Sequence, residues 1–441
     1  MPRPRRVGFC RYHRGFRAGT LPRVREGITP AEALRCVLGE IRVLGSEVVA
    51  TRDAQGRVLA EPVIATRRLP PADNSAMDGY AVRRADVSHA TPERGVDLRV
   101  AFEIPAGATI DTQLSPGTAA RILTGAPLPP GADAIVRQED TRRDGDTVRI
   151  LVAPEPRQHV RDAGEDVEPG ERVIESGTRL GPAHLGFLAS LGRSAVAVHQ
   201  RPRVAVLSGG DELVEPDGNI AGGRIVSSNS YSIAAQCREL GADPVYLGIA
   251  RDTPEDVERH LRAGLRADVL VSSAGVSVGD RDYVRGALEK LGCRLLFWGV
   301  KMKPGYPLAF GRVETDAGPL VFGLPGNPVS AMMTFEQFVR PALRKMAGFS
   351  ALHRPLLRAR LAQDLVKQAG RLHFVRVSLE REDETWLARS TGNQSSGVLR
   401  SMILAQGILV FPAEATRLAA GVEVAVQVVD DDVLAHDSPG F

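Results

Sequence analysis

The spacing of hydrophobic residues changes from one segment of the chain to the next. Between residues 28 and 45 they recur with helical periodicity, and Thr29 and Pro30 suit the N-cap and the first helical position. From about 60 to 165, short alternating runs are separated by Pro- and Gly-rich segments, which is typical of small antiparallel sheets. The apolar residues of the expected helix are Ala31, Leu34, Leu38 and Ile41.

The second half of the chain has two further patterns. Between 201 and 347, apolar runs such as RVAVLS and ADVLVSS alternate with helical segments. This order of strand, helix and strand predicts a doubly wound α/β domain. From 350 to 441, polar and apolar residues alternate one by one, most clearly in GVEVAVQVV, which predicts a small β-barrel or sandwich.

Composition and charge narrow the class of protein. A chain of 441 residues with 43% hydrophobic and 25% charged residues is typical of about two to four globular domains. No run approaches the roughly 20 apolar residues of a membrane helix, so we expect a soluble protein without membrane contact. We expect a cytoplasmic location, because RYHRGFR stands where a secretory signal would have its apolar region. The first 25 residues carry eight arginines and no acid. Since the whole chain has a net charge of +3, the remaining residues have a net charge of −5. That acidic remainder argues against nucleic-acid binding, and we expect the arginine-rich arm to be a solvated tail.

Cysteines and histidines show none of the spacings that are typical of zinc sites. The four cysteines are far apart and form no CxxC, and the nine histidines include no HExxH. Any metal would therefore be held by oxygen ligands, which favours Mg²⁺ over zinc.

Acidic residues follow three predicted strands of the α/β region. They are Glu212 in GGDE, Asp252 in RD and Asp282 in GDRD. Ligands of open α/β sheets bind beyond the carboxyl ends of the strands, and carboxylates beside a phosphate would repel it unless a cation intervened. We therefore predict a Mg²⁺ ion that bridges these acids and phosphoryl oxygens, although each acid alone could simply cap a helix or face solvent.

Two of the five lysines, Lys301 and Lys303, lie within three residues of each other. A compact ammonium group suits an oxyanion, but lysines also protect exposed strand edges, and this segment alone favours neither interpretation. Further along, the rigid PGNP turn fixes a loop beside the other strand ends, and Asn327 and Pro328 suit the start of a helix.

Taken together, these segments resemble the molybdopterin molybdenumtransferase family, to which the C-terminal domain of gephyrin is also similar. The motifs that carry the likeness occur in the family's order from about residue 28 to the end: DNSAMDGYAVR, RILTGAPLPPGADAIV, RDAGED, SSAGVSVGDRDYV, LPGNPVSA and GRLHFVR. The resemblance implies an enzyme that inserts molybdenum from molybdate into adenylylated molybdopterin, with Mg²⁺-dependent release of AMP.

The resemblance also implies a homodimer of four-domain subunits. The fold class is then multi-domain α/β plus β, with a doubly wound domain, a β-rich second domain, a helical and extended linker domain and a C-terminal β-barrel. The expected boundaries are 1–27 for a disordered arm, 28–62 and 165–200 for the linker and dimerisation domain, 63–164 for the β-rich domain, 201–347 for the α/β molybdopterin-binding domain and 348–441 for the barrel.

The resemblance implies functions for the residues that match the family's motifs. The expected catalytic residues are Asp78, Glu212, Asp252, Asp282 and Lys303, of which Glu212, Asp252 and Asp282 would also bind Mg²⁺. The residues expected to bind the molybdopterin substrate or molybdate are Thr124, Arg161, Asp166, Ser277, Lys301, Pro325, Pro328, Arg376 and Ser396. In the implied dimer, Asp78 and Thr124 of one subunit would meet the acids of the other.

Two positions depart from the family's pattern. Gly299 and Tyr306 stand where relatives commonly carry lysine. We hypothesise that Lys301, two residues from Gly299 on the same strand face, restores one of these cations. Undiminished molybdate affinity in Lys301→Ala would reject this hypothesis.

Two other functions compete with the transferase. A molybdopterin adenylyltransferase would resemble residues 201–347 alone, but it lacks the DNSAMDGYA region and the C-terminal barrel. A molybdopterin-binding interaction scaffold would not need the intact set of acids. For the transferase we expect a transient contact with that adenylyltransferase, and molybdate and tungstate remain equal candidates because they share shape and charge.

Overall fold

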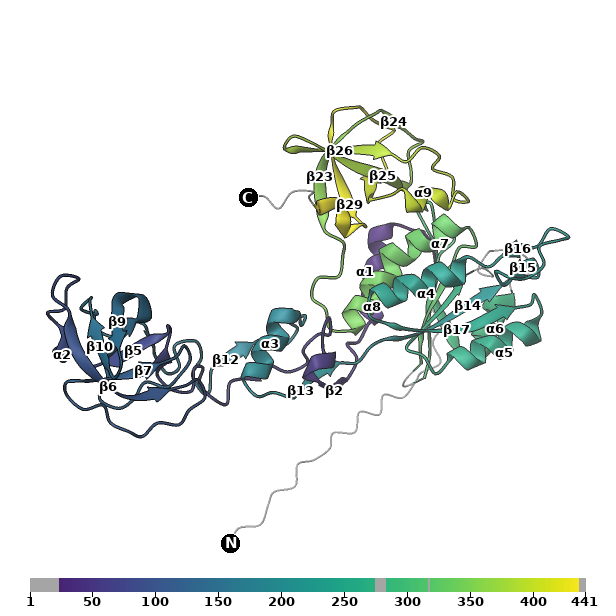
Figure 1. Ribbon diagram of the computed structural model, residues 1–441. Coiled ribbons are helices and arrows are strands. Elements are labelled where there is room, and N and C mark those ends of the chain that lie inside the picture. Colours follow the sequence, from purple (N-terminus) through teal and green to yellow (C-terminus); the bar gives the residue numbers. More distant parts are fainter. Residues whose placement is uncertain (1–23, 274–282, 316–317, 436–441) are drawn as a thin grey trace, which may run out of the picture. The chain divides into compact units, whose positions relative to one another are not determined.

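The computed structural model describes residues 24–273, 283–315 and 318–435 (Figure 1). Contacts divide the chain into two compact units. The first contains the chain up to Ile41 together with Pro202–Leu343 and Leu352–Phe441, and the second contains Arg42–Arg201 and Arg344–Ala351. No helix in the described ranges is both long and apolar enough to cross a membrane.

The first unit is built on a seven-stranded sheet, which confirms the doubly wound α/β domain. Helices α5 (Pro254–Gly264) and α6 (Tyr283–Lys290) pack together on one face, and α4 (Asn229–Glu239) and α7 (Pro328–Thr334) on the other (Figure 1). Because helices cover both faces, the central strands are almost continuously apolar. In spatial order the strands are β1 (Arg25–Ile28), β19 (Cys293–Val300), β21 (Ala309–Val313), β22 (Leu320–Leu324), β18 (Val269–Ser273), β14 (Arg203–Gly209) and β17 (Asp243–Ala250). Only β21 runs antiparallel to its neighbours.

The N-terminal end of this unit differs from the expected domain boundaries. Residues 25–28 form β1, paired in parallel with β19, whereas the sequence suggested a disordered arm over 1–27. The following helix, α1 (Pro30–Glu40), packs against β19, so residues 28–41 belong to this unit and not to the linker domain.

Helix α1 has the predicted cap but a different buried face. The side chain of Thr29 accepts a hydrogen bond from the Glu32 N–H, and the Glu32 carboxylate accepts one from the Thr29 N–H, which together form a capping box. The buried residues are Ala33 and Val37, while Ala31 is exposed. The small side chains face the sheet because they allow the helix to approach it closely.

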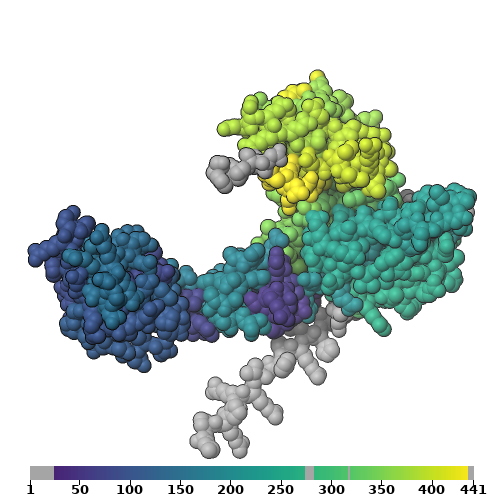
Figure 2. All heavy atoms as spheres, viewed as in Figure 1, coloured from purple at the N-terminus to yellow at the C-terminus, as the bar shows by residue number. Residues whose placement is uncertain are grey.

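The C-terminal part of the first unit is a closed barrel of five strands. The register closes from β25 through β26, β23 and β29 to β27 and back to β25. Figure 2 shows this yellow-green barrel packed on the teal and green α/β part. The strands are β23 (Leu356–Leu361), β25 (Leu372–Glu382), β26 (Thr385–Ser390), β27 (Gly407–Phe411) and β29 (Glu423–Val428), and the smaller elements are β24 (Leu365–Val366), β28 (Arg417–Leu418) and α9 (Arg400–Ile403).

Short elements connect the sheet to the barrel and extend the loops. Strand β20 (Met302–Lys303) leaves the α/β part and pairs with β25 of the barrel. Helix α7 continues through a π-helical turn, Phe335–Val339, into α8 (Arg340–Met346). Strands β15 (Leu213–Val214) and β16 (Ile225–Val226) form a small pair after β14.

The second unit contains the expected β-rich region and a smaller part of strand pairs. Its six-stranded sheet is antiparallel except for β6 and β7, which run parallel. An entirely antiparallel sheet was therefore a wrong prediction, because the connection over 105–117 is long enough to return the chain to the same end. In spatial order the strands are β8 (Ala134–Arg137), β5 (Gly79–Val82), β7 (Thr118–Ile122), β6 (Val96–Ile104), β10 (Thr147–Ile150) and β9 (Thr141–Asp144). The paired short strands are β2 (Ser46–Ala50) with β13 (Ala195–His199), β3 (Val63–Ile64) with β12 (Arg172–Ile174), and β4 (Asn74–Ser75) with β11 (Val160–Arg161), and the helices are α2 (Arg84–Val87) and α3 (Pro182–Ser190).

Candidate active site

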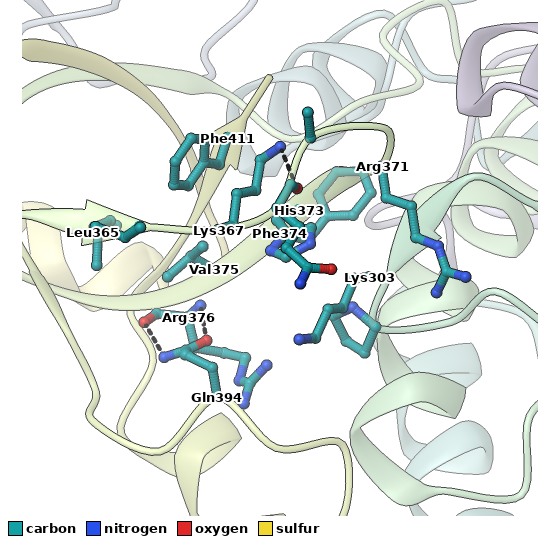
Figure 3. A pocket seen from close by; sticks show the side chains of 14 residues that line it. Lys303, Leu365, Lys367, Arg371, His373, Phe374, Val375, Arg376, Gln394 and Phe411 are labelled. Atoms are coloured by element: carbon teal, nitrogen blue, oxygen red, sulfur yellow. Dashed lines mark hydrogen bonds between the residues drawn. The ribbon is translucent and has the colours of Figure 1, made fainter. Parts of the chain in front are cut away.

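A basic cavity of about 470 Å³ lies where β20 meets the barrel (Figure 3). The pairing of β20 with β25 sets Lys303 opposite His373. Lys367, Arg371 and Arg376 also line the cavity, and none of the described residues that line it is acidic. This combination of several cations and no carboxylate creates a positive potential that favours anions.

Arg376 is the buried cation of this cavity. Its side chain lies on β25 and is fully buried, at 0% exposure. The Nε atom donates to the Ser401 hydroxyl at 3.1 Å, and Nη2 donates to the carbonyls of Asn393 and Ser395 at 3.3 and 3.2 Å. Burial lowers the pKa of Arg376 to about 10, so the guanidinium remains charged at neutral pH.

The Nη1 group of Arg376 has no hydrogen-bond partner among the described residues. No carboxylate contacts the guanidinium either, in the part of the chain that the structure describes. A buried, charged donor without a partner is costly, because it has lost its hydration without replacement. The missing partner of Nη1 is a hydrogen-bond acceptor, preferably one with negative charge.

His373 stands among three of the cations. Burial, followed by the charges of Lys303, Lys367 and Arg371, lowers the pKa of His373 to about 4. The imidazole packs edge-on against Phe411, with ring centroids 6.3 Å apart. At neutral pH the ring is uncharged and can donate or accept a hydrogen bond.

The loop that carries Ser396 connects this cavity to the start of α7. The Ser396 carbonyl accepts a hydrogen bond of 3.1 Å from the N–H of Val329, directly after Pro328. Pro325 is buried at the end of β22. Asn327 occupies the expected N-cap position, but its side chain makes no capping hydrogen bond. The structure thus brings Pro325, Pro328, Ser396 and Arg376 into one region of the first unit.

The predicted acids at the ends of β14 and β17 are neighbours and exposed. The Asp252 N–H donates to the carboxylate of Asp211 at 3.2 Å, so the turn after β17 lies beside the turn that carries Glu212. These carboxylates offer the oxygen donors that Mg²⁺ prefers. Among the described residues, however, no three His, Cys, Asp or Glu side chains are close enough together to hold a metal. Asp282 and Ser277 lie outside the described residues.

Asp78 and Thr124 contact each other in the second unit. The Asp78 carboxylate accepts hydrogen bonds of 2.7 Å from both the N–H and the hydroxyl of Thr124. These two bonds lower the pKa of Asp78, and the side chain is exposed to solvent. Strand β11 sets Arg161 opposite Asn74 in the same cluster of loops, and Asp166 bonds through its N–H to the Leu69 carbonyl.

Comparison with known proteins assigns the chain to a family. Three family profiles match: the MoeA N-terminal region (domains I and II) over residues 28–192, a probable molybdopterin binding domain over 205–345, and the MoeA C-terminal region (domain IV) over 358–429. The molybdopterin molybdenumtransferase of Nostoc sp. is 39% identical over 384 residues, which are 86% of this chain and 88% of the relative. Molybdopterin molybdenumtransferase 2 of Mycobacterium tuberculosis is 40% identical over 401 residues, 90% of this chain and 98% of the relative.

The chain belongs to the MoeA family of molybdopterin molybdenumtransferases. Two crystal structures of the molybdopterin biosynthesis MoeA protein from Pyrococcus horikoshii match its fold with TM-scores of 0.79 and 0.76. They are 32% and 31% identical in sequence, and each covers 91% of this chain and at least 99% of its own. The predicted family and the predicted multi-domain fold are therefore confirmed.

Sequence reasoning missed part of the site of this MoeA-family protein. Lys367, Arg371 and His373 line the cavity, but only Lys303 and Arg376 were expected there. A signal was present, because Arg371 and His373 alternate in GRLHFVR and so share one face of a strand. Lys301 does not line the cavity, and its role in oxoanion binding stays a prediction.

Proposed function

We propose that this chain inserts molybdenum from molybdate into adenylylated molybdopterin and releases AMP. The observation that carries the proposal is a basic cavity without an acidic residue among the described residues that line it, beside the buried guanidinium of Arg376, whose Nη1 group has no hydrogen-bond partner among the described residues. Membership of the MoeA family supplies the reaction class. A cation set of this kind suits a tetrahedral dianion such as molybdate.

Each part of the cavity has a defined role in this proposal. The free Nη1 group of Arg376 donates to a molybdate oxygen, and the Lys303 ammonium neutralises the second negative charge. The Ser396 hydroxyl is proposed as a further donor from the loop that follows the lining residue Gln394, although Ser396 itself does not line the cavity. The neutral His373 adds a directional hydrogen bond without adding charge.

The proposal includes a Mg²⁺ ion, which the carboxylate oxygens of Glu212, Asp252 and Asp282 would hold. When bound, this ion neutralises charge on the phosphoanhydride that is cleaved. Glu212 and Asp252 would bind this ion and so orient the phosphoanhydride, since their carboxylates follow neighbouring strands of one sheet. Asp78 is proposed as a further catalytic residue. The remaining residues proposed to bind substrate are Thr124, Arg161, Asp166, Ser277, Pro325 and Pro328.

A homodimer, a cytoplasmic location and a transient contact with molybdopterin adenylyltransferase are further parts of the proposal. The dimer is tested by sedimentation equilibrium of the full chain at micromolar concentration. A monomer over that range would reject it.

The decisive experiment is incubation of the full chain with adenylylated molybdopterin, Mg²⁺ and molybdate, followed by measurement of AMP. We expect AMP release that depends on molybdate and is strongly reduced in Arg376→Met. Release at the rate of a control without protein would reject the transferase, and would favour the interaction scaffold if molybdopterin still bound.

A further inference from the structure

Tyr306 fills a notch between two glycines in the sheet. Gly27 and Gly299 lie at adjoining positions of the paired strands β1 and β19, since Glu26 pairs with Trp298 and Ile28 with Val300. Both glycines have positive φ, 58° and 77°. A Cβ atom at Gly299 would come within 3.2 Å of the Tyr306 ring, and one at Gly27 would come within 3.5 Å of its hydroxyl oxygen. The absence of side chains at these positions thus leaves the space that the aromatic ring occupies.

The ring of Tyr306 is fixed in this notch from several directions. Trp298 packs against it edge to face, with centroids 5.7 Å apart. The main chain of Tyr306 is also held, because its carbonyl accepts hydrogen bonds from Val300 at 2.9 Å and Leu308 at 2.8 Å. A ring held in this way presents a fixed face to any side chain that stacks on it.

Arg371 stacks on that face. Its guanidinium carbon lies 4.9 Å from the centroid of the Tyr306 ring, within the range of a cation–π contact. Arg371 also lines the basic cavity together with Lys303. Among the described residues, no carboxylate forms a hydrogen bond or an ion pair with the Arg371 guanidinium. The donors of Arg371 are therefore available to an anion while the ring restricts their position.

From these contacts we propose that Tyr306 is a positioning residue that holds Arg371 as an anion-binding cation of the cavity. The proposal rests on the proposed function, since it assigns a further residue to recognition of the tetrahedral oxoanion. It also gives Gly299 a purpose, because a Cβ atom there would press on the ring, whereas one at Gly27 would make only an ordinary van der Waals contact with the hydroxyl. Lys301 does not line the cavity, so this proposal assigns the anion-binding charge to Arg371 and not to Lys301.

The test measures molybdate affinity by isothermal titration in the full-length protein and four variants. We expect Arg371→Ala to weaken binding about ten-fold, as is typical of the loss of one charge-assisted hydrogen bond. Tyr306→Ala should weaken it about five-fold, and Tyr306→Phe, which keeps the ring, should remain within about two-fold of the wild type. In the double variant Tyr306→Ala/Arg371→Ala, the affinity should equal that of Arg371→Ala alone.

Controls separate positioning from a general loss of structure. Arg358→Ala removes an exposed arginine from the same barrel, outside the cavity, and should leave molybdate affinity unchanged. The thermal midpoint of each variant is recorded, and Tyr306→Leu replaces Tyr306→Ala if the latter unfolds. Wild-type affinity in Arg371→Ala would overturn the proposal, as would losses that multiply in the double variant. A wild-type protein that binds no molybdate would instead reject the oxoanion site of the proposed function.

Discussion

Lys303 and His373 occupy paired positions of the parallel strands β20 and β25, although they are far apart in the sequence. This pairing sets an ammonium group next to an imidazole in a cavity whose lining, within the described part of the chain, contains no acidic residue. Protonation of the imidazole would add a positive charge beside those of Lys303, Lys367 and Arg371, which is unfavourable. The pairing of β20 with β25 therefore helps to keep His373 uncharged, because it places Lys303 beside the imidazole.

We expect His373 to make the folded protein less stable in mild acid. Its pKa is about 4 in the folded protein, whereas an unfolded histidine titrates near 6.5. Between these values the unfolded chain binds more protons, so the contribution of His373 to stability is fully present above pH 6.5 and is lost as the pH falls toward 4. Because solvent reaches part of the ring, we expect an effect of about 1 kcal/mol between pH 7 and pH 5.

Urea unfolding at pH 7 and at pH 5 measures this contribution in the wild type and in His373→Gln. The glutamine variant keeps a hydrogen-bonding side chain but cannot titrate. It should lose less stability than the wild type over this interval. Equal losses in the two proteins would contradict the expected low pKa of His373.

Arg376→Met is expected to separate anion binding from stability. The variant removes the buried guanidinium, so molybdate affinity should fall at least about ten-fold. Stability without ligand should change little, because the hydrogen bonds lost to Ser401, Asn393 and Ser395 are offset by relief of a buried, partly unsatisfied charge. Titration calorimetry and urea unfolding on the same samples test both parts, and an unchanged affinity would exclude Arg376 from the anion site.

Local sequence signals were enough for much of the fold. The cap of α1 at Thr29 and Pro30 follows from short-range hydrogen bonding, and the strands that precede Glu212 and Asp252 follow from apolar runs. The parallel pairing of β6 with β7 was missed, because strand direction depends on how a long connection returns and not on the pattern of the strands.

The candidate site was predicted less completely than the fold. Arg371 and His373 approach Lys303 only through the pairing of β20 with β25, which is a tertiary contact between distant segments. Likewise, the notch that holds Tyr306 requires Gly27 and Gly299 to meet across two strands. The spacing of residues within one segment does not predict contacts between distant segments. The order of the motifs along the chain was nevertheless sufficient to indicate the family.

Asp78→Asn tests the role of the second unit. The hydrogen bonds from Thr124 lower the pKa of Asp78 below its usual value near 3.8, so the carboxylate stays ionised from pH 5 to 8. We expect the variant to reduce AMP release at least about ten-fold while molybdate affinity stays unchanged, since the basic cavity lies in the first unit. Thr124→Ser keeps both donors and serves as the matched control. Full AMP release by Asp78→Asn would remove this residue from the catalytic set.

A buried ion-pair network should dominate the stability of the junction between α7, α8 and the barrel. The Glu336 carboxylate, with its side chain 7% exposed, contacts Arg354 at 2.8 Å and Arg340 at 3.3 Å. Both guanidinium groups are about 90% buried as well, and burial lowers the pKa of Arg340. Glu239 contacts the same arginines, but half of its side chain is exposed.

Removing the charge of Glu336 leaves two buried cations with one exposed partner. We therefore expect Glu336→Gln to lower the free energy of unfolding by about 3 kcal/mol, since breaking a buried pair exposes the cost of the unpaired charges. Glu239→Gln deletes the same charge at the solvent-facing end of the network and should lower it by less than about 1 kcal/mol. Urea unfolding of both variants at pH 7 gives the comparison. Similar losses in the two variants would mean that solvent screens Glu336 as effectively as Glu239, contrary to its burial.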